Sequence, residues 1–153
     1  MPIRLDQIIQ EVSEQAEILA EIKGITFSAK LTQEISILGD EFRLRQLFFN
    51  LLDNAIKYTN AGGNIAVSLE AMDGQAKITV ADTGIGIPEE DLPYIFDRFY
   101  RVDKARSHDA NGGGLGLSIC QWIAQQHKGN IEIESKWGEG STFTTYLPMT
   151  PLR

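Results

Sequence analysis

The feature that most constrains the fold is a change of hydrophobic period in the middle of the chain. Between residues 40 and 58 the apolar residues recur at helical spacing, which predicts an amphipathic helix capped at its start by Asp40. The next segments, 65–71 and 76–80, alternate apolar with polar or small residues, and Asp73-Gly74 between them is typical of a tight hairpin turn. A helix and a hairpin that each bury one face predict a layered domain of helices on a sheet.

The segments before this helix contain one more helix and two short strands. Apolar residues at helical spacing predict a helix over residues 3–22 that ends near Gly24. Residues 25–31 and 36–38 are short and rich in β-forming residues, which predicts a pair of strands.

A long segment without an apolar face, residues 84–113, follows the hairpin. A loop of that length inside a compact domain is typical of a functional lid or an insert, with room for a short helix after Pro88. A helix is predicted over 114–127 and strands over 130–136 and 141–147. The side of this helix that is predicted to be apolar consists of Leu115, Ile119, Trp122, Ile123 and Gln126. The whole pattern predicts a two-layer α+β sandwich in a single domain.

Composition and charge exclude several classes of protein. The 153 residues carry a formal net charge of −7, with 42% apolar and 23% charged residues, which is typical of a folded globular domain. Nucleic acid is not an expected partner, because binding to phosphate backbones needs a basic face. No apolar run approaches the roughly 18 residues of a membrane-spanning helix, so we expect a cytoplasmic domain and leave open a membrane anchor in the parent protein. The lone Cys120 lies among apolar residues and is predicted to be a core thiol.

A carboxylate at the end of a strand is the first candidate site residue. Asp82 has the same parity as Ile78 and Val80, so its side chain is expected to face the helix layer with them. A buried carboxylate needs hydrogen-bond donors, and the exocyclic amine of adenine is one such donor. The alternative is an Asx turn or a helix cap formed by Asp82. Gly84 and Gly86 favour a ligand, because they allow backbone to approach a flat molecule closely.

A polar stripe on the central helix is the second candidate. Asn50, Asn54 and Lys57 are spaced i, i+4, i+7 and lie beside the apolar stripe. Amide oxygens are suitable Mg²⁺ ligands, and the lysine can neutralise phosphate charge. The alternative is an ordinary solvated face, but this helix is otherwise densely apolar and asparagine is a poor helix former.

A glycine-rich run, residues 112–117, opens the last helix. Free N–H groups at a helix N-terminus bind phosphate well. The run fits neither the P-loop nor the dinucleotide-binding spacing. A flexible linker is the alternative, although Leu115 and Leu117 between the glycines count against a simple hinge.

Together these segments resemble the motifs of one family. Residues 50–58, 82–87, 96–104 and 112–117 resemble, in this order, the N, G1, F and G2 boxes of the catalytic, ATP-binding domains of bacterial sensor histidine kinases. Residues 138–143 are similar to the glycine turn that closes these domains. The resemblance covers nearly the whole chain, and the F box separates it from the gyrase, Hsp90 and MutL members of the superfamily.

The resemblance implies the Bergerat ATP-binding fold, in which about three main helices pack on one face of a mixed, mostly antiparallel five-stranded sheet. It implies a lid over residues about 87–113, ATP and Mg²⁺ as cofactors, and Asn54 as the metal ligand. Asn50, Lys57 and Arg101 are the implied catalytic residues. The implied nucleotide-binding residues are Asn50, Asn54, Lys57, Tyr58, Asp82, Gly84, Gly86, Ile87, Tyr100, Arg101, Gly112, Gly114, Leu115, Gly116, Leu117 and Thr142.

Two details qualify the resemblance. Phe96 and Phe99 are expected to anchor the lid rather than to touch ATP. Gly113 stands where threonine or serine is common in the family, which removes a hydroxyl from the lid without arguing against binding.

The implied function is transfer of the γ-phosphoryl group of ATP to a histidine on a separate dimerisation domain, with a response regulator downstream. Neither His108 nor His127 lies in a sequence similar to the acceptor motif Ser-His-Glu-Leu-Arg-Thr-Pro. We therefore expect the acceptor and sensor domains to be absent, and the isolated domain to be a monomer with little activity alone. The alternatives are an anti-sigma-type serine kinase and a non-catalytic nucleotide-sensing module of the same superfamily.

Overall fold

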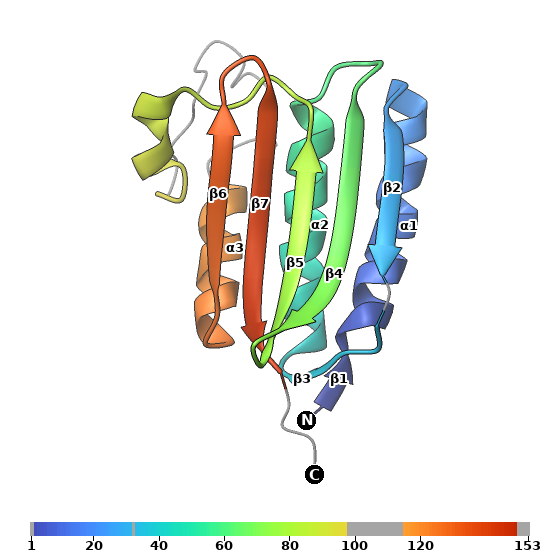
Figure 1. The fold of residues 1–153 in the computed structure, drawn as a ribbon, viewed down its shortest axis with the longest axis vertical. Coiled ribbons are helices and arrows are strands. Elements are labelled where there is room, and N and C mark those ends of the chain that lie inside the picture. The colour runs from blue at the N-terminus through green and yellow to red at the C-terminus, as the bar shows by residue number, and fades with distance from the viewer. Residues whose placement is uncertain (1, 32, 98–114, 150–153) are drawn as a thin grey trace.

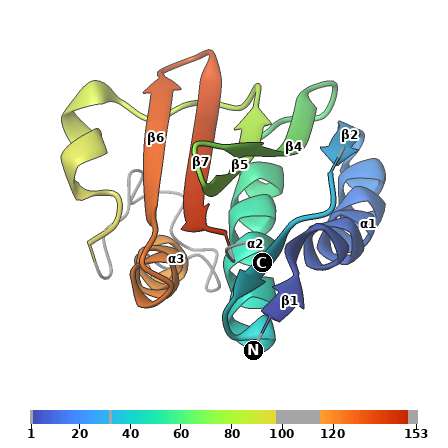
Figure 2. The same ribbon diagram turned by 60° about the horizontal axis from the view of Figure 1, so that its bottom comes forward.

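The computed structural model describes residues 2–31, 33–97 and 115–149. Helices cover one face of a sheet and leave the other face open (Figures 1 and 2). The helices are α1 (Leu5–Lys23), α2 (Glu41–Lys57) and α3 (Leu115–Gln126). A short 3-10 helix, η1 (Glu89–Tyr94), lies beside the edge strand β6.

The described residues form a sheet of five strands, in the order β2 (Thr26–Leu31), β4 (Asn64–Met72), β5 (Gln75–Asp82), β7 (Gly140–Pro148) and β6 (Asn130–Lys136). The β2–β4 pair is parallel, and the other three pairs are antiparallel. This confirms the predicted two-layer α+β sandwich with a mixed, mostly antiparallel sheet. The β4–β5 hairpin turns at Asp73 and Gly74, whose φ angles of 53° and 79° both lie in the left-handed region that such a two-residue turn requires.

Both short segments predicted as strands, 25–31 and 36–38, are strands, but they lie in different sheets. β2 pairs with β4, whereas β3 (Ser36–Leu38) pairs antiparallel with β1 (Pro2–Arg4). Three-residue strands carry too little pattern to specify a partner. For the same reason the first helix starts at Leu5 and not at residue 3: the residues before Leu5 form a strand.

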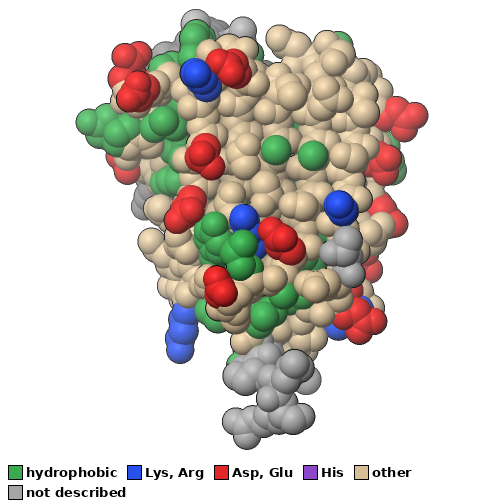
Figure 3. Space-filling view, in the orientation of Figure 1, with side chains coloured by type: hydrophobic (Ala, Val, Ile, Leu, Met, Phe, Trp, Pro, Cys, Tyr) green, Lys and Arg blue, Asp and Glu red, His purple; other side chains and the backbone are tan. Residues whose placement is uncertain are grey.

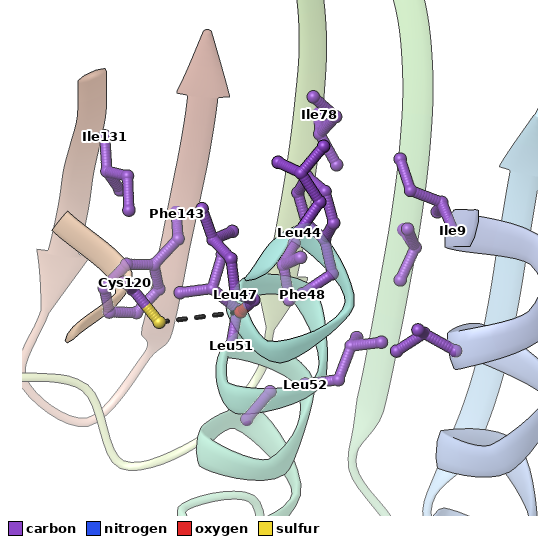
Figure 4. Close-up of a cluster of buried hydrophobic side chains, with 14 of the residues drawn as sticks. Ile9, Leu44, Leu47, Phe48, Leu51, Leu52, Ile78, Cys120, Ile131 and Phe143 are labelled. Atoms are coloured by element: carbon purple, nitrogen blue, oxygen red, sulfur yellow. Dashed lines mark hydrogen bonds between the residues drawn. The ribbon is translucent and has the colours of Figure 1, made fainter. Parts of the chain in front are cut away.

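The core lies between the sheet and the helices. Leu44, Leu47, Phe48 and Leu51 of α2 are at most 1% exposed and form its centre (Figure 4). Cys120 of α3 is fully buried, and its thiol lies 3.5 Å from the carbonyl oxygen of Leu47. Burial raises the pKa of this thiol to about 12, against a hydrogen bond with Asn50 that lowers it. Cys120 is therefore the core thiol that the sequence predicts.

The buried side of α3 differs from the predicted one. It consists of Cys120, Ile123 and Ala124, each 0% exposed, whereas Trp122 is 48% exposed. The Trp122 ring lies at the surface, with the Arg43 guanidinium 5.4 Å from its centroid. A cation–π contact stabilises an indole ring at the surface, so the ring need not be fully buried. The spacing of hydrophobic residues along the helix does not predict such a contact.

The start of α2 is held by a cap and by the end of α3. The Asp40 side chain accepts a hydrogen bond from the Arg43 N–H at 3.1 Å, which confirms the predicted N-cap. His127 Nε2 accepts from the Asp40 N–H at 3.0 Å, and its Nδ1 lies 2.8 Å from the Ile123 carbonyl oxygen. A neutral ring protonated at Nδ1 satisfies both contacts.

We expect Asp40→Ala to lower the free energy of unfolding by about 1 kcal/mol, because it removes the acceptor for an otherwise unpaired helical N–H. Thermal unfolding should show a melting temperature lower by roughly 2–4 °C. Asp40→Asn is the matched control, since asparagine caps as well as aspartate. An equal loss in both variants would show that the charge of Asp40, and not its cap, stabilises the helix.

The face of the sheet away from the helices is mostly polar. Figure 3 shows it covered largely by backbone and uncharged polar side chains, with charged and hydrophobic side chains in small separate groups. Of the described helices, none combines the length and apolar character that a membrane crossing requires.

Candidate nucleotide site

The sequence-predicted site residues that the structure describes lie mainly at one end of the sandwich. The end of β5, the C-terminal turn of α2 and the connection between β6 and β7 meet at the upper edge in Figure 1. Residues 83–87, here called the β5 loop, run between them.

Asp82 is the last residue of β5 and faces the helix layer, as predicted. Asp82 pairs with Ser141 on β7. The next pair on the same face of the sheet, Val80 and Phe143, is buried. Asp82 Oδ1 accepts hydrogen bonds from the backbone N–H groups of Gly84 at 2.8 Å and Ser141 at 3.2 Å. Within the described part of the chain, no donor contacts Oδ2. The Asx turn considered from the sequence is thus present, and it uses one of the two carboxylate oxygens.

The surroundings of Asp82 alter its acidity. Burial raises the pKa of Asp82 above its ordinary value, and the hydrogen bonds from Gly84 and Ser141 partly oppose this. A half-buried carboxylate whose charge is incompletely compensated favours a ligand that brings hydrogen-bond donors.

Backbone hydrogen bonds hold the β5 loop on both sides. The Ile85 N–H donates to the carbonyl oxygen of Tyr58 at the end of α2, at 3.0 Å. On the other side, the Ile85 carbonyl accepts from the Gly138 N–H at 2.7 Å, and the Ile87 N–H donates to Ser135 Oγ at 2.7 Å. The loop is therefore a rigid bridge from α2 to the β6–β7 turn.

Two glycines of this loop are required by close packing. A Cβ on Gly84 would lie 2.3 Å from the Tyr58 carbonyl oxygen. Gly86 has a φ of +75°, and a Cβ there would lie 2.0 Å from the Lys136 carbonyl oxygen. The sequence predicted that these glycines allow close approach to a ligand. The structure shows that their first partner is the protein's own backbone.

The polar stripe of α2 lies on the side of the helix toward the same end. Asn50, Asn54 and Lys57 are all half-buried, and Asn50 hydrogen-bonds with the Cys120 thiol. The Lys57 ammonium pairs with Asp53 at 3.1 Å, an i, i+4 contact within the helix. Tyr58, the C-cap of the helix, is 39% exposed.

The remaining predicted residues divide into three groups. Ile87 is 9% exposed, and Leu117 packs against the core. Gly116 lies in the first turn of α3, where an added Cβ would meet no atom of the described residues within 4 Å. Leu115 is the first residue of α3. The residues outside the described part are Phe99, Tyr100, Arg101, His108, Gly112, Gly113 and Gly114.

The structure does not bring the Thr142 side chain to this site. Thr142 pairs with Ala81 and Glu134, so its side chain lies on the open face, opposite that of Asp82. Its neighbour Ser141, 8% exposed, is the residue on the site face. Neighbouring strand residues point to opposite faces, and the motif resemblance did not fix which of the two faces inward.

Ser135 and Ser141 are site residues that the sequence reasoning missed. Ser141 Oγ lies 2.7 Å from Ser135 Oγ, and Ser135 Oγ lies 3.1 Å from the Gly140 carbonyl oxygen. The inward orientation of Ser135 could have been predicted from the sequence, because Ser135 follows Ile131 and Ile133 at alternate positions of the same strand.

Phe96, expected to anchor the lid, contacts the core. Its ring meets that of Phe143 edge-on, with centroids 6.4 Å apart and planes at 86°. This arrangement is favourable for two aromatic rings.

An open groove of about 560 Å³ lies at the opposite end of the sandwich, between the start of α2 and the end of α3. Arg43, Trp122, His127 and Met149 are among its lining residues. It contains no residue of the predicted nucleotide site.

Known proteins match this chain closely. Residues 39–151 match the family described as histidine kinase-, DNA gyrase B-, and HSP90-like ATPases. The sensor histidine kinase RppB of Synechocystis is 42% identical over 146 residues, which are 95% of this chain and 32% of RppB. The chain spans about a third of the length of the curated relatives that it matches.

Solved structures agree with this assignment. A mycobacterial sensor histidine kinase, MprB, has a TM-score of 0.86 at 29% identity, with 99% of this chain and 100% of that chain covered. Full-length ShkA in complex with AMPPNP has a TM-score of 0.83 at 30% identity, with 99% of this chain and 31% of that chain covered. The chain therefore belongs to the histidine kinase-, DNA gyrase B- and HSP90-like ATPase family, and within it to the ATP-binding catalytic domains of two-component sensor histidine kinases.

Proposed function

We propose that this domain binds Mg-ATP at the end of β5 and donates the γ-phosphoryl group to a histidine on a separate dimerisation domain. The observation that carries the proposal is the half-buried carboxylate of Asp82. Two backbone N–H groups hold Oδ1 in place, and within the described residues Oδ2 has no donor. An adenine amine supplies the missing donor. The complex of the similar protein ShkA with AMPPNP supports a nucleotide as the ligand.

The α2 stripe fits a magnesium ion carried by a nucleotide. The amide side chains of Asn50 and Asn54 lie one helical turn apart, and their oxygens are hard ligands. The resemblance assigns the metal to Asn54, with Asn50 in support. A magnesium ion bound there would neutralise phosphate charge, and it needs few protein ligands besides phosphate and water oxygens.

Lys57 is placed to exchange one anionic partner for another. Its ammonium pairs with Asp53 at 3.1 Å, and both side chains are about a third exposed. Exposed pairs of this kind contribute little stability, so a phosphate group can displace Asp53 at small cost. Lys57 would then hold the phosphates while the β5 loop holds the base.

Phosphoryl transfer requires mainly positioning and neutralisation of charge at the γ-phosphate. Lys57 and the amides of α2 supply part of both, and the resemblance assigns Arg101 a similar part. The nucleophile is a histidine of another domain, and a response regulator then receives the phosphate. We expect the isolated domain to bind nucleotide, to be monomeric and to hydrolyse ATP very slowly. A cytoplasmic location follows from this role.

The test is incubation of the chain with labelled ATP, Mg²⁺ and a dimerisation hairpin that carries the acceptor histidine. We expect label on the hairpin that is lost in acid and retained in base, the behaviour of phosphohistidine. Chelation of Mg²⁺ and a hairpin whose acceptor histidine is replaced by alanine are the matched controls, and both should abolish labelling.

The other outcomes identify the rival functions. Label on a protein substrate that is lost in base and retained in acid would indicate phosphoserine and an anti-sigma-type kinase. Tight ATP binding without any transfer would indicate a nucleotide-sensing module. Either result would overturn the proposed activity.

A further inference from the structure

A row of three polar residues crosses the sheet beneath the β5 loop. Asp82, Ser141 and Ser135 are direct neighbours on β5, β7 and β6, and all three face the helix layer. The next row that faces the helices, Val80, Phe143 and Ile133, is apolar. The polar row therefore marks the boundary between the core and the site.

The hydrogen bonds of Ser135 determine where the hydrogens of this row lie. Ser135 Oγ accepts from the Ile87 N–H at 2.7 Å. The Gly140 carbonyl oxygen, 3.1 Å away, has no hydrogen, so in this contact Ser135 donates. Because a hydroxyl has one hydrogen, the 2.7 Å contact with Ser141 is satisfied only if Ser141 Oγ donates to Ser135 Oγ.

Ser141 then has no hydrogen left for a ligand. Its oxygen offers only lone pairs beside Asp82, whose Oδ1 accepts the Ser141 N–H at 3.2 Å. Directly opposed residues of an antiparallel pair have their Cβ atoms about 4.5–5.5 Å apart, so one ligand edge can meet both side chains. The site thus presents two adjacent acceptors.

A carboxylate alone does not specify adenine. Adenine has a donor amine at position 6, but guanine and hypoxanthine carry a donor N1–H next to their carbonyl O6, and a carboxylate can accept that hydrogen as well. A neighbouring group that can only accept changes this balance. Such an acceptor can receive a hydrogen bond from the 6-amino group of adenine. Opposite an O6 carbonyl, the lone pairs of the two oxygens would repel each other.

We propose that Ser135 is a positioning residue that holds the Ser141 hydroxyl as an acceptor, so that the site selects 6-amino over 6-oxo purine nucleotides. The inference rests on the proposed nucleotide site and assigns its specificity to a residue that does not touch the base. Removal of the Ser135 hydroxyl frees the Ser141 hydrogen to rotate toward an O6 carbonyl.

The test compares the affinities of Mg-ADP and Mg-IDP, measured by calorimetry, because the two bases differ at position 6 without the 2-amino group of guanine. We expect Ser135→Ala to lower the ADP/IDP affinity ratio about tenfold, the effect of one hydrogen bond gained by O6. Ser135→Thr keeps a hydroxyl and should keep the wild-type ratio. Thr144→Ala, on the open face of β7, is the control for a general effect on the sheet.

A purely structural role of Ser135 gives a different result. Loss of the acceptor for the Ile87 N–H loosens the β5 loop and weakens both nucleotides alike. An unchanged ratio in Ser135→Ala would therefore overturn the inference. Should that variant fail to fold, Ser141→Ala removes the acceptor itself, and an unchanged ratio there is equally decisive. Absence of nucleotide binding by the wild-type chain would instead overturn the proposed function.

Discussion

Asp82→Asn is expected to weaken Mg-ADP binding by roughly 10- to 100-fold, because it replaces the charged acceptor of the adenine amine by a neutral amide. Hydrogen bonds to charged groups contribute about 1.5–3 kcal/mol, and each 1.4 kcal/mol corresponds to a factor of ten in affinity. An asparagine can also turn its NH₂ group toward the ligand, where donor would meet donor. Calorimetric titration with Mg-ADP measures the effect directly.

The same substitution should not destabilise the fold. Asparagine Oδ1 can accept the N–H groups of Gly84 and Ser141, so the turn at the end of β5 is retained. Burial also raises the pKa of Asp82, so the folded state disfavours its charged form. We therefore expect Asp82→Asn to be at least as stable as the wild type at pH 7, as is common where function requires a partly buried charge.

The pH dependence of stability provides a separate check on Asp82. In the window between the ordinary aspartate pKa of about 3.9 and the raised pKa, folded Asp82 holds a proton that the unfolded chain has released. The contribution of Asp82 to stability therefore falls as the pH rises through this window. The free energy of unfolding of Asp82→Asn should therefore rise above that of the wild type as the pH increases through this window, and the difference should vanish at lower pH.

Asp73→Asn is a matched control for the same chemical change. Asp73 lies in the left-handed turn of the β4–β5 hairpin, a conformation that asparagine adopts well. It should leave both nucleotide affinity and stability unchanged. Wild-type affinity in Asp82→Asn would contradict the assignment of Asp82 to the base.

Gly86→Ala is expected to be strongly destabilising. The φ of +75° costs an L-residue about 1–2 kcal/mol. In addition, the new Cβ would lie 2.0 Å from the Lys136 carbonyl oxygen, which is backbone and cannot turn aside. The loop and the β6–β7 turn must then move apart, which breaks the 2.7 Å hydrogen bond between Gly138 and Ile85.

We expect a loss of about 3–5 kcal/mol for Gly86→Ala, the range of the most severe point mutations, and a melting temperature lower by roughly 10 °C. Gly74→Ala is the matched control. Its φ of +79° imposes the same backbone strain, but an added Cβ meets no atom within 4 Å among the described residues. It should lose only about 1–2 kcal/mol. Equal losses would show that backbone strain, and not the close approach to Lys136, requires a glycine at position 86.

The elements with strong periodicity were predicted correctly, and the reasons are physical. The apolar stripe of α2 and the cap at Asp40 are local signals, as is the turn at Asp73-Gly74. Strand alternation also predicted correctly that Asp82 faces inward, because its register continues from Ile78 and Val80. In each case the information lies within a few residues along the chain.

The predictions failed or stayed incomplete where the position of a residue depends on contacts with residues far away in the sequence. β2 and β3 were predicted as strands, but their partners, β4 and β1, could not be identified from such short segments. Trp122 was grouped with Ile119 and Ile123 on one side of the helix, whereas its ring lies at the surface beside Arg43. Thr142 was named as a nucleotide-binding residue, and its side chain lies on the open face, because a motif resemblance does not tell the two faces of a strand apart.

By itself, the sequence determined the layered α+β architecture, the family and the order of the site segments along the chain. The tertiary structure decided that Ser135 and Ser141 share a hydrogen bond beside Asp82, and that Gly86 is required by the backbone of Lys136. Periodicity is set by the local geometry of helices and strands, so it can be read along the chain. The acceptor role of Ser135 toward the Ile87 N–H and the space beside Gly86 depend on contacts between the β5 loop and β6, which lie far apart along the chain and which only folding brings together.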